Sequence, residues 1–424
     1  MRVNDAFMAH YNQPRRARLR GLARNPELHG ERLLRVLEHP ERVRISVFSR
    51  PHWTEEAFAT LAAHPDRQVR VDLAEAGSLP PPLRARLVDD PEASVRAATI
   101  TGPSWRPYWE RREPTLPHWA YERLAGDPSE RVLETLRSTY SVPAQFRDPP
   151  APPAAQELDL EALARSEVAA ERLEAARAPG LPAELVARLA ADPVPSIRLA
   201  VSMRRELTEQ QRAAIDYEVR PADRIRAARW AATTDDPDEL RRCVESAHIG
   251  LRRSVAYNRN LSPAQIEVLA ADPDFAVRLL LCENHREVPG DLVLATYLES
   301  RVITAPDMLR HPSFPRRGLA ARAGDENPRI RALVHLDPDA SPALIDRLSR
   351  DEHPQVRAWS AGDPRLTAAR VLELLEDPET ASGAASNPNL PEAAMDAIIA
   401  EAHDIVDDYE GTPTVMLGRP PETD

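Results

Sequence analysis

The chain has 424 residues, too many for one ordinary hydrophobic core, so several domains or a repeat array are expected. With 42% hydrophobic and 29% charged residues its balance is that of a globular protein, and its net charge of −12 argues against a general nucleic-acid coat. Two cysteines exclude a disulfide framework, and we expect a reduced, cytoplasmic setting, since neither a signal peptide nor a membrane span is visible.

The first predicted element is a basic N-terminal region. Residues 1–50 hold 11 arginines against 5 acidic residues. Its arginine cluster is the one local basic patch able to meet phosphates. The alternative is a solvated terminal helix. The cluster consists of Arg15, Arg16, Arg18, Arg20 and Arg24.

A Val-Arg or Ile-Arg dipeptide then recurs, usually four residues after a proline, as in Pro65 to Val69-Arg70. Successive arginines are most often 26 residues apart, and such a fixed period indicates stacked repeats. We expect each arginine to pair with an aspartate of the adjacent layer, forming a ladder; the alternative is a row of guanidinium groups lining an anion groove. The predicted ladder consists of Arg44, Arg70, Arg96, Arg198, Arg226, Arg252, Arg278, Arg331 and Arg357.

Each repeat contains signals for two short helices. The first opens at Asp-Pro or His-Pro, where an aspartate such as Asp90 can cap a helix that begins with proline. The second opens at Leu-Pro or Ser-Pro, as at Ser262-Pro263. Helices this short are marginal alone, so the units must stack on one another. The sequence therefore predicts an all-α fold, specifically an α-solenoid.

Residues 255–278 carry the pattern most completely, from Val-Ala-Tyr-Asn through Leu-Ser-Pro and Leu-Ala-Ala-Asp-Pro to Val-Arg. This pattern resembles the leucine-rich repeat variant, a bacterial relative of the HEAT-like repeats, over most of residues 25–400. The resemblance implies alternating α and 3₁₀-like helices in a right-handed superhelix and no common enzymatic activity. Some members hold an iron–sulfur cluster in a cysteine-rich N-terminal segment, but the first cysteine here is Cys243, so no cofactor is carried over.

Residues 101–121 interrupt the period with an aromatic insertion. Aromatic residues beside arginine are typical of binding hot spots, whereas the alternative is a small core for the insertion itself. The candidate partner-binding residues are Trp105, Arg106, Tyr108, Trp109, Arg111, Arg112 and Trp119.

A proline-rich linker at 143–156 is predicted to separate an N-terminal array, 1–142, from a C-terminal array, 157–410, followed by a disordered acidic tail, 411–424. Residues 371–424 hold 13 acidic residues against Arg419. The oppositely charged chain ends could pair head-to-tail between copies, giving a homo-oligomer, or dock partners of opposite sign. The alternative is a tail that only aids solubility.

No motif for catalysis, a cofactor or a metal is present: His-x-x-x-His, Cys-x-x-Cys, Gly-x-Gly-x-x-Gly, Walker and Gly-x-Ser-x-Gly patterns are all absent. We therefore expect a non-enzymatic scaffold or adaptor that binds a protein or peptide. A nucleic-acid-binding protein resembling the HEAT-like DNA glycosylases and a self-associating structural protein stay as alternatives. All 55 basic residues are arginine, as a high-GC genome that favours arginine codons would give; the alternative is selection against lysine modification.

Overall fold

A computed structural model describes residues 14–39, 41–103, 106–107, 109–111, 113–148, 159–221, 223–302 and 305–402. Across these ranges every regular element is a helix, which confirms the all-α prediction. No helix in them is long and apolar enough to cross a membrane. Trp105, Tyr108, Arg112 and the predicted tail at 411–424 lie outside the described residues.

The chain forms two compact units. Unit 1 combines residues 1–106, 113–148 and 316–424, and unit 2 combines 107–112 with 149–315. The change of unit after residue 148 falls within the predicted linker at 143–156. A second change, after residue 315, lies inside the predicted C-terminal array, so the last repeats of the chain belong with the first ones.

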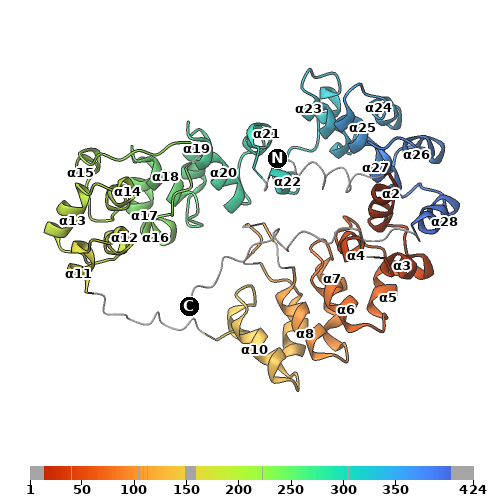
Figure 1. Cartoon of the computed structure of the whole chain (residues 1–424), viewed down its shortest axis with the longest axis horizontal. Helices are drawn as coiled ribbons and strands as arrows, with labels where there is room; N and C mark the ends of the chain where they lie inside the picture. The colour runs from red at the N-terminus through yellow and green to blue at the C-terminus, as the bar shows by residue number, and fades with distance from the viewer. Residues whose placement is uncertain are drawn as a thin grey trace. The chain divides into compact units, whose positions relative to one another are not determined.

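Unit 1 is built from short helices in two stretches of sequence (Figure 1). The first stretch contains α2 (Pro14–Ala23), α3 (Gly30–Leu37), α4 (Glu41–Phe48), α5 (Glu55–Ala62), α6 (Arg67–Ala74), α7 (Pro81–Arg84), η1 (Ala85–Asp89), α8 (Ala93–Thr101), α9 (His118–Ala125), α10 (Glu130–Ser138) and η2 (Ala144–Phe146). The second contains η3 (Leu319–Arg322), α23 (Pro328–Ala332), η4 (Leu333–Leu336), α24 (Pro342–Leu348), α25 (Pro354–Ala361), α26 (Ala368–Leu375), α27 (Ala381–Ala385) and α28 (Glu392–Glu401).

The first helices of successive repeats pack side by side, so that one repeat makes one layer. In unit 1, α23 packs on α25, α25 on α27, α27 on α2, and α2 on α4; further along, α6 packs on α8 and α8 on α10. The second helices follow the same order, since α28 contacts α3 and α3 contacts α5. Leu19 and Leu22 of α2 therefore share one hydrophobic core with Ala384 and Ile398. The two ends of the described chain are adjacent layers of one stack (Figure 1).

Unit 2 contains a second set of layers. Its helices are α11 (Leu160–Arg165), α12 (Ala169–Arg177), α13 (Ala183–Ala190), α14 (Pro195–Ser202), α15 (Glu209–Ala213), α16 (Arg229–Thr233), α17 (Pro237–Val244), α18 (Ile249–Val255), α19 (Pro263–Ala270), α20 (Phe275–Asn284), α21 (Gly290–Glu299) and α22 (Ala305–Met308). α12 packs on α14, α16 on α18, and α18 on α20.

One predicted repeat helix, the one containing Ile225 and Arg226, does not form. The described residues between α15 and α16 are not helical. The Asp223 carboxylate accepts from the Arg220 N–H at 2.8 Å, which closes a turn. The Arg253 guanidinium donates to the Arg220 and Asp223 carbonyls at 3.3 and 3.0 Å. These side-chain hydrogen bonds hold the segment in its non-helical conformation, and the next helix starts at α16.

The helix starts follow two patterns. Second helices begin as expected: Ser262 caps α19 with Gln265 in a capping box, and Pro263 follows it at the first position. Among the first helices, α8 differs from the expectation. Asp90 was expected to be its N-cap, but the N-cap is Glu92. Asp90 instead accepts from the Glu92 N–H at 2.9 Å and from Arg70 of the preceding layer. The aspartate thus joins two layers rather than capping its own helix.

Candidate functional site

Buried arginine–aspartate pairs link successive layers. Arg331 donates Nε and Nη2 to the Asp351 carboxylate at 2.9 and 2.8 Å, and Nη1 to the carbonyls of Asp325 and Glu326 at 2.9 and 3.3 Å. The two side chains are only 10% and 11% exposed. Hydrogen bonding between them raises the pKa of Arg331 and lowers the pKa of Asp351. A guanidinium held by four protein oxygens is engaged inside the stack.

The same geometry recurs with regular spacing. Arg70–Asp90, Arg172–Asp192, Arg252–Asp272 and Arg331–Asp351 are each 20 residues apart. Arg96 reaches Asp127 at 2.6 and 2.9 Å across 31 residues, 11 more than the others, and the aromatic insertion at 101–121 lies between them.

The other predicted ladder arginines vary in their partners. Arg44 donates to Asp72 at 2.7 Å, and Arg278 to Glu299 at 2.6 Å. Arg198 contacts the Asp216 carbonyl at 2.5 Å, and Arg357 contacts Glu379. Arg226 is exposed and lies outside any helix.

Sequence reasoning missed Arg172, because Glu171 stands where the motif has valine or isoleucine. Its place 26 residues before Arg198 was the available signal.

A second row of inter-layer hydrogen bonds was also missed. Asn258 donates Nδ2 to the carbonyls of Ala231 and Thr234 at 2.9 Å each. Asn387 does the same for Ala361 and Asp363 at 2.9 and 2.7 Å. These carbonyls lie at the ends of helices in the preceding layer, where they have no intrahelical partner. The recurring Ala-x-Asn in the repeat pattern was the signal for this row.

Histidine and arginine replace asparagine in this row at other layers. The His285 Nε2 lies 2.9 Å from the Ala256 carbonyl, and the Arg50 guanidinium donates to the carbonyls of Ala23 and Leu28 at 3.3 Å each. Arg50 is fully buried, and burial lowers its pKa to about 10. The row is therefore structural: an asparagine, histidine or arginine side chain of one layer binds the free carbonyls of the preceding layer.

A buried serine–histidine contact in unit 2 has the distance of a catalytic pair. The Ser202 Oγ lies 2.8 Å from the His248 Nε2. However, the His248 Nδ1 accepts from the Gly250 N–H at 3.0 Å, so Nδ1 carries no proton and Nε2 must carry it. Nε2 then donates to Ser202, whose hydroxyl donates to the Leu199 carbonyl at 2.8 Å. A nucleophile needs the opposite arrangement, with Nε2 as proton acceptor.

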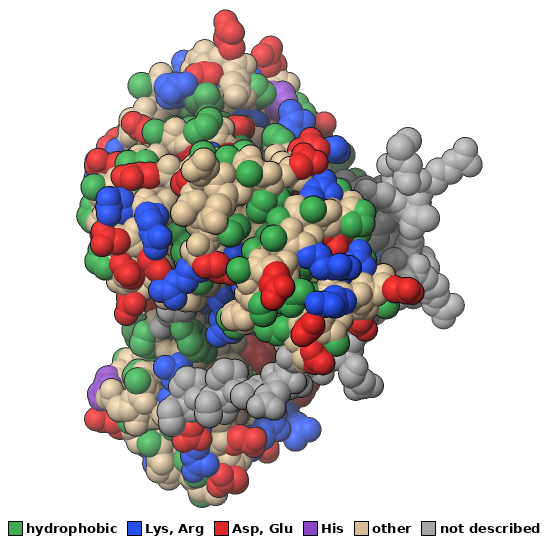
Figure 2. Space-filling view, turned by 90° about the vertical axis from the view of Figure 1, so that its left-hand side faces the viewer, with side chains coloured by type: hydrophobic (Ala, Val, Ile, Leu, Met, Phe, Trp, Pro, Cys, Tyr) green, Lys and Arg blue, Asp and Glu red, His purple; other side chains and the backbone are tan. Residues whose placement is uncertain are grey.

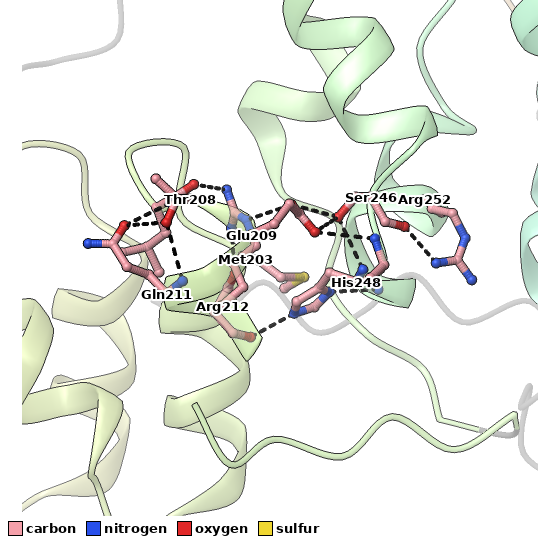
Figure 3. Close-up of polar contacts among 12 residues, drawn as sticks. Met203, Thr208, Glu209, Gln211, Arg212, Ser246, His248 and Arg252 are labelled. Carbon is pink, nitrogen blue, oxygen red and sulfur yellow. Dashed lines mark hydrogen bonds and ion pairs between the residues drawn. The ribbon is translucent and has the colours of Figure 1, made fainter. Parts of the chain in front are cut away.

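The surroundings of His248 hold it neutral (Figure 3). Burial, followed by the charge of Arg212, lowers the pKa of His248 to about 4. The Glu209 carboxylate accepts from the Ser246 hydroxyl at 3.0 Å, and Arg252 donates to the Ser246 carbonyl at 2.8 Å. This polar network fixes α15 against the start of α18 and leaves both Ser202 and His248 inaccessible, at 0% and 1% exposure.

The two cysteines and the possible metal ligands were also located in the described ranges. Cys243 and Cys282 are free and fully buried, and burial raises the pKa of each to about 12. No group of three or more metal-ligating side chains gathers among the residues that the structure describes.

The insertion residues have separate environments. Trp109 is buried, with its ring edge-on to His311 at 4.7 Å between centroids. Arg106 donates to the Glu113 carbonyl at 2.8 Å, and Arg111 is exposed. Trp119, on α9, is 52% exposed.

Aromatic side chains gather where the unit 1 stack ends, at α9, α10 and η2. His118 lies beside Phe146 at 5.4 Å between ring centroids. Arg147 covers the Tyr140 ring at 5.0 Å, and Tyr140 is 55% exposed. We call Trp119, His118, Phe146, Tyr140 and Arg147 the aromatic end surface.

Much of the N-terminal basic patch is directed at the C-terminal helices. Arg18 donates to the Leu375 carbonyl at 3.0 Å and contacts Glu376 and Glu401 at 3.1 and 3.4 Å. Arg24 donates to the Ser382 hydroxyl at 3.0 Å. The oppositely charged ends that were expected to join separate copies thus pair within one chain. Arg15 is exposed, and Arg16 and Arg20 are partly buried.

On the face that Figure 2 presents, arginine and acidic side chains alternate with apolar ones, and neither sign forms a continuous field. A surface that follows a nucleic-acid backbone concentrates positive charge instead. In comparisons with known proteins, no family model matches this chain and no curated protein matches it significantly.

Proposed function

We propose that this chain is a non-enzymatic scaffold that binds a protein or peptide partner. The observation that carries the proposal is the aromatic end surface. Trp119 and Tyr140 are both more than half exposed, at 52% and 55%, and the Arg147 guanidinium lies over the Tyr140 ring. Exposed aromatic rings with an adjacent arginine are the side chains that dominate protein–protein binding energies.

The position of this surface supports the proposal. In one repeat the ladder residue Arg96 lies six residues after Asp90. The equivalent position in the last layer, six residues after Asp127, holds Leu133 of α10. The ladder position therefore holds an apolar residue in the last layer. The chain then folds back over α10, with the Asp148 N–H donating to the Arg137 carbonyl at 3.1 Å. The ladder of unit 1 ends at this layer, beside the aromatic end surface.

The proposed architecture is a right-handed α-solenoid of the leucine-rich repeat variant type, acting in the cytoplasm. Support comes from the 26-residue period and from helices that pack on their counterparts in the next layer. The partner recognised at the end of such a stack would be a folded protein or a peptide with apolar side chains.

The test compares partners captured by three full-length proteins: wild type, Trp119→Ala/Tyr140→Ala, and a control, Val268→Ala. Val268 is 55% exposed on α19 and lies outside the aromatic end surface. A partner retained by wild type and control but lost by the double variant supports the proposal. It is then purified, and calorimetry is expected to give at least a ~10-fold weaker Kd for the double variant. Equal binding by all three proteins would refute the role of this surface.

Nucleic acid is the competing class of partner, supported by the arginine-rich composition. The pairing of Arg18 with Glu376 and Glu401 weighs against nucleic-acid binding at the basic patch, because the positive charge of Arg18 is already neutralised. A gel shift with duplex DNA at low salt, with affinity falling steeply as salt rises, would favour nucleic acid over a protein partner.

A further inference from the structure

The contact between the chain ends has the register of two consecutive repeats. Asn25, at the end of α2, donates Nδ2 to the carbonyls of Ala385 and Asn387 at 3.1 and 2.7 Å. Within the C-terminal array, Asn387 donates in the same way to Ala361 and Asp363. Asn25 therefore binds the layer of α27 in the same way as Asn387 binds the layer of α25. This match holds although 362 residues separate Asn25 from Asn387.

Close backbone approach repeats with the same spacing. A Cβ on Gly21 would lie 2.2 Å from the Ser382 carbonyl oxygen, and a Cβ on Gly383 would lie 2.6 Å from the Ala358 carbonyl oxygen. Each glycine precedes its asparagine by four residues. We call the packing of α2 and α3 on α27 and α28 the chain-end joint.

Ion pairing at the chain-end joint differs from the ladder. Gly383 lies 26 residues after Arg357, so the ladder has no arginine in α27. Instead, arginines of the N-terminal layer reach back to acidic residues of the C-terminal layers. Arg32 contacts Asp396 at 2.8 Å and Glu392 at 2.9 Å.

The acidic partners at the joint are far more exposed than those of the ladder. Glu376, Glu401, Glu392 and Asp396 are 75%, 46%, 76% and 47% exposed. The ladder aspartates Asp90, Asp127, Asp192 and Asp272 are 4–5% exposed. The acidic side chains at the joint can therefore be changed without burying an unpaired ion.

We propose that the chain-end joint also forms between two copies of this chain, with α2 and α3 of one copy packed on α27 and α28 of the other. Its two faces are different and complementary in shape and charge. The two layers at the joint are also far apart along the chain, so no short turn connects them. Exchange of both ends builds a dimer with two joints identical to the internal one, as in domain swapping. Internal closure prevails at low protein concentration because the two ends belong to one chain.

Charge reversal can select between the internal and the exchanged joint. The first full-length variant carries Arg18→Glu and Arg32→Glu. The second carries arginine at the four acidic positions, Glu376→Arg, Glu392→Arg, Asp396→Arg and Glu401→Arg. In each variant the internal joint brings like charges together. In a mixed dimer, both joints pair opposite charges.

The two variants are incubated together in ~1 M salt, where the ion pairs are screened, and then returned to low salt. Light scattering with size exclusion is expected to show a 1:1 complex of twice the 47.2 kDa monomer mass, at least ~10-fold more abundant than in either variant alone. A mixture that stays at the monomer mass would overturn the proposal, as would equal dimerisation of each variant alone.

The matched control carries glutamine at the same six positions. It has neither the repulsion within one chain nor the attraction between two chains, so mixing should give no excess of dimer. Circular dichroism follows folding in parallel. If a charge-reversed variant is poorly folded alone, regained helix on mixing supports the exchanged joint, and no regain on mixing counts against it.

Discussion

Breaking one buried ladder pair should destabilise the layers on both sides of it. The perturbation is Arg331→Met, which keeps the apolar stem and removes the guanidinium. Asp351 would keep its hydrogen bond from the His353 N–H at 2.8 Å but lose both bonds from Arg331. A carboxylate that is 11% exposed would then be left without its counter-ion.

The magnitude follows from this burial. Loss of one partner of a buried ion pair costs about 3–5 kcal/mol, because the remaining charge is uncompensated. The matched control is Arg123→Met. Arg123 donates to Asp89 at 2.9 Å, but the two side chains are 64% and 63% exposed. Exposed pairs contribute about 0–1 kcal/mol, so this control should be nearly neutral.

Amide hydrogen exchange is the suitable assay, since repeat arrays need not unfold in one step. Protection should fall in α23, α24 and α25 for Arg331→Met and stay unchanged for Arg123→Met. A double-mutant cycle with Asp351→Asn isolates the pair. Equal effects of the two arginine substitutions would refute the distinction between buried ladder and surface pairs.

Acidification tests His248: its folded pKa of about 4 lies below the ordinary 6.5, so the unfolded chain binds the proton first. Stability should fall as the pH drops from 6.5 to 4, by on the order of 3 kcal/mol, and His248→Gln should flatten this dependence in urea titrations. Cys243 and Cys282 should resist alkylation at pH 8 and react once unfolded, as mass spectrometry would show; rapid labelling of the native protein would contradict their burial. Gly383→Val should lower Tm sharply because the added Cβ would lie 2.6 Å from the Ala358 carbonyl oxygen, whereas a Cβ added at Gly324 has no neighbour within 4 Å, so Gly324→Val should not.

The sequence determined the local unit. The 26-residue period predicted where the repeats lie, and the Ser-Pro signals predicted helix starts such as α19, because capping depends on residues within one turn. The all-α class followed from the same local patterns. The repeated arginine was visible from its period, and four of the arginine–aspartate pairs keep one spacing of 20 residues.

Only the tertiary structure decided which residues depart from the pattern. Arg226 has the motif but no helix, and Arg253 from another layer donates to the carbonyls of Arg220 and Asp223 in that non-helical segment. Likewise, Asp90 joins two layers instead of capping one helix. The chain-end joint depends on contacts across more than 350 residues, as between Asn25 and Asn387. A local pattern specifies the two faces that pack together, but only the completed stack brings the first repeat onto the last.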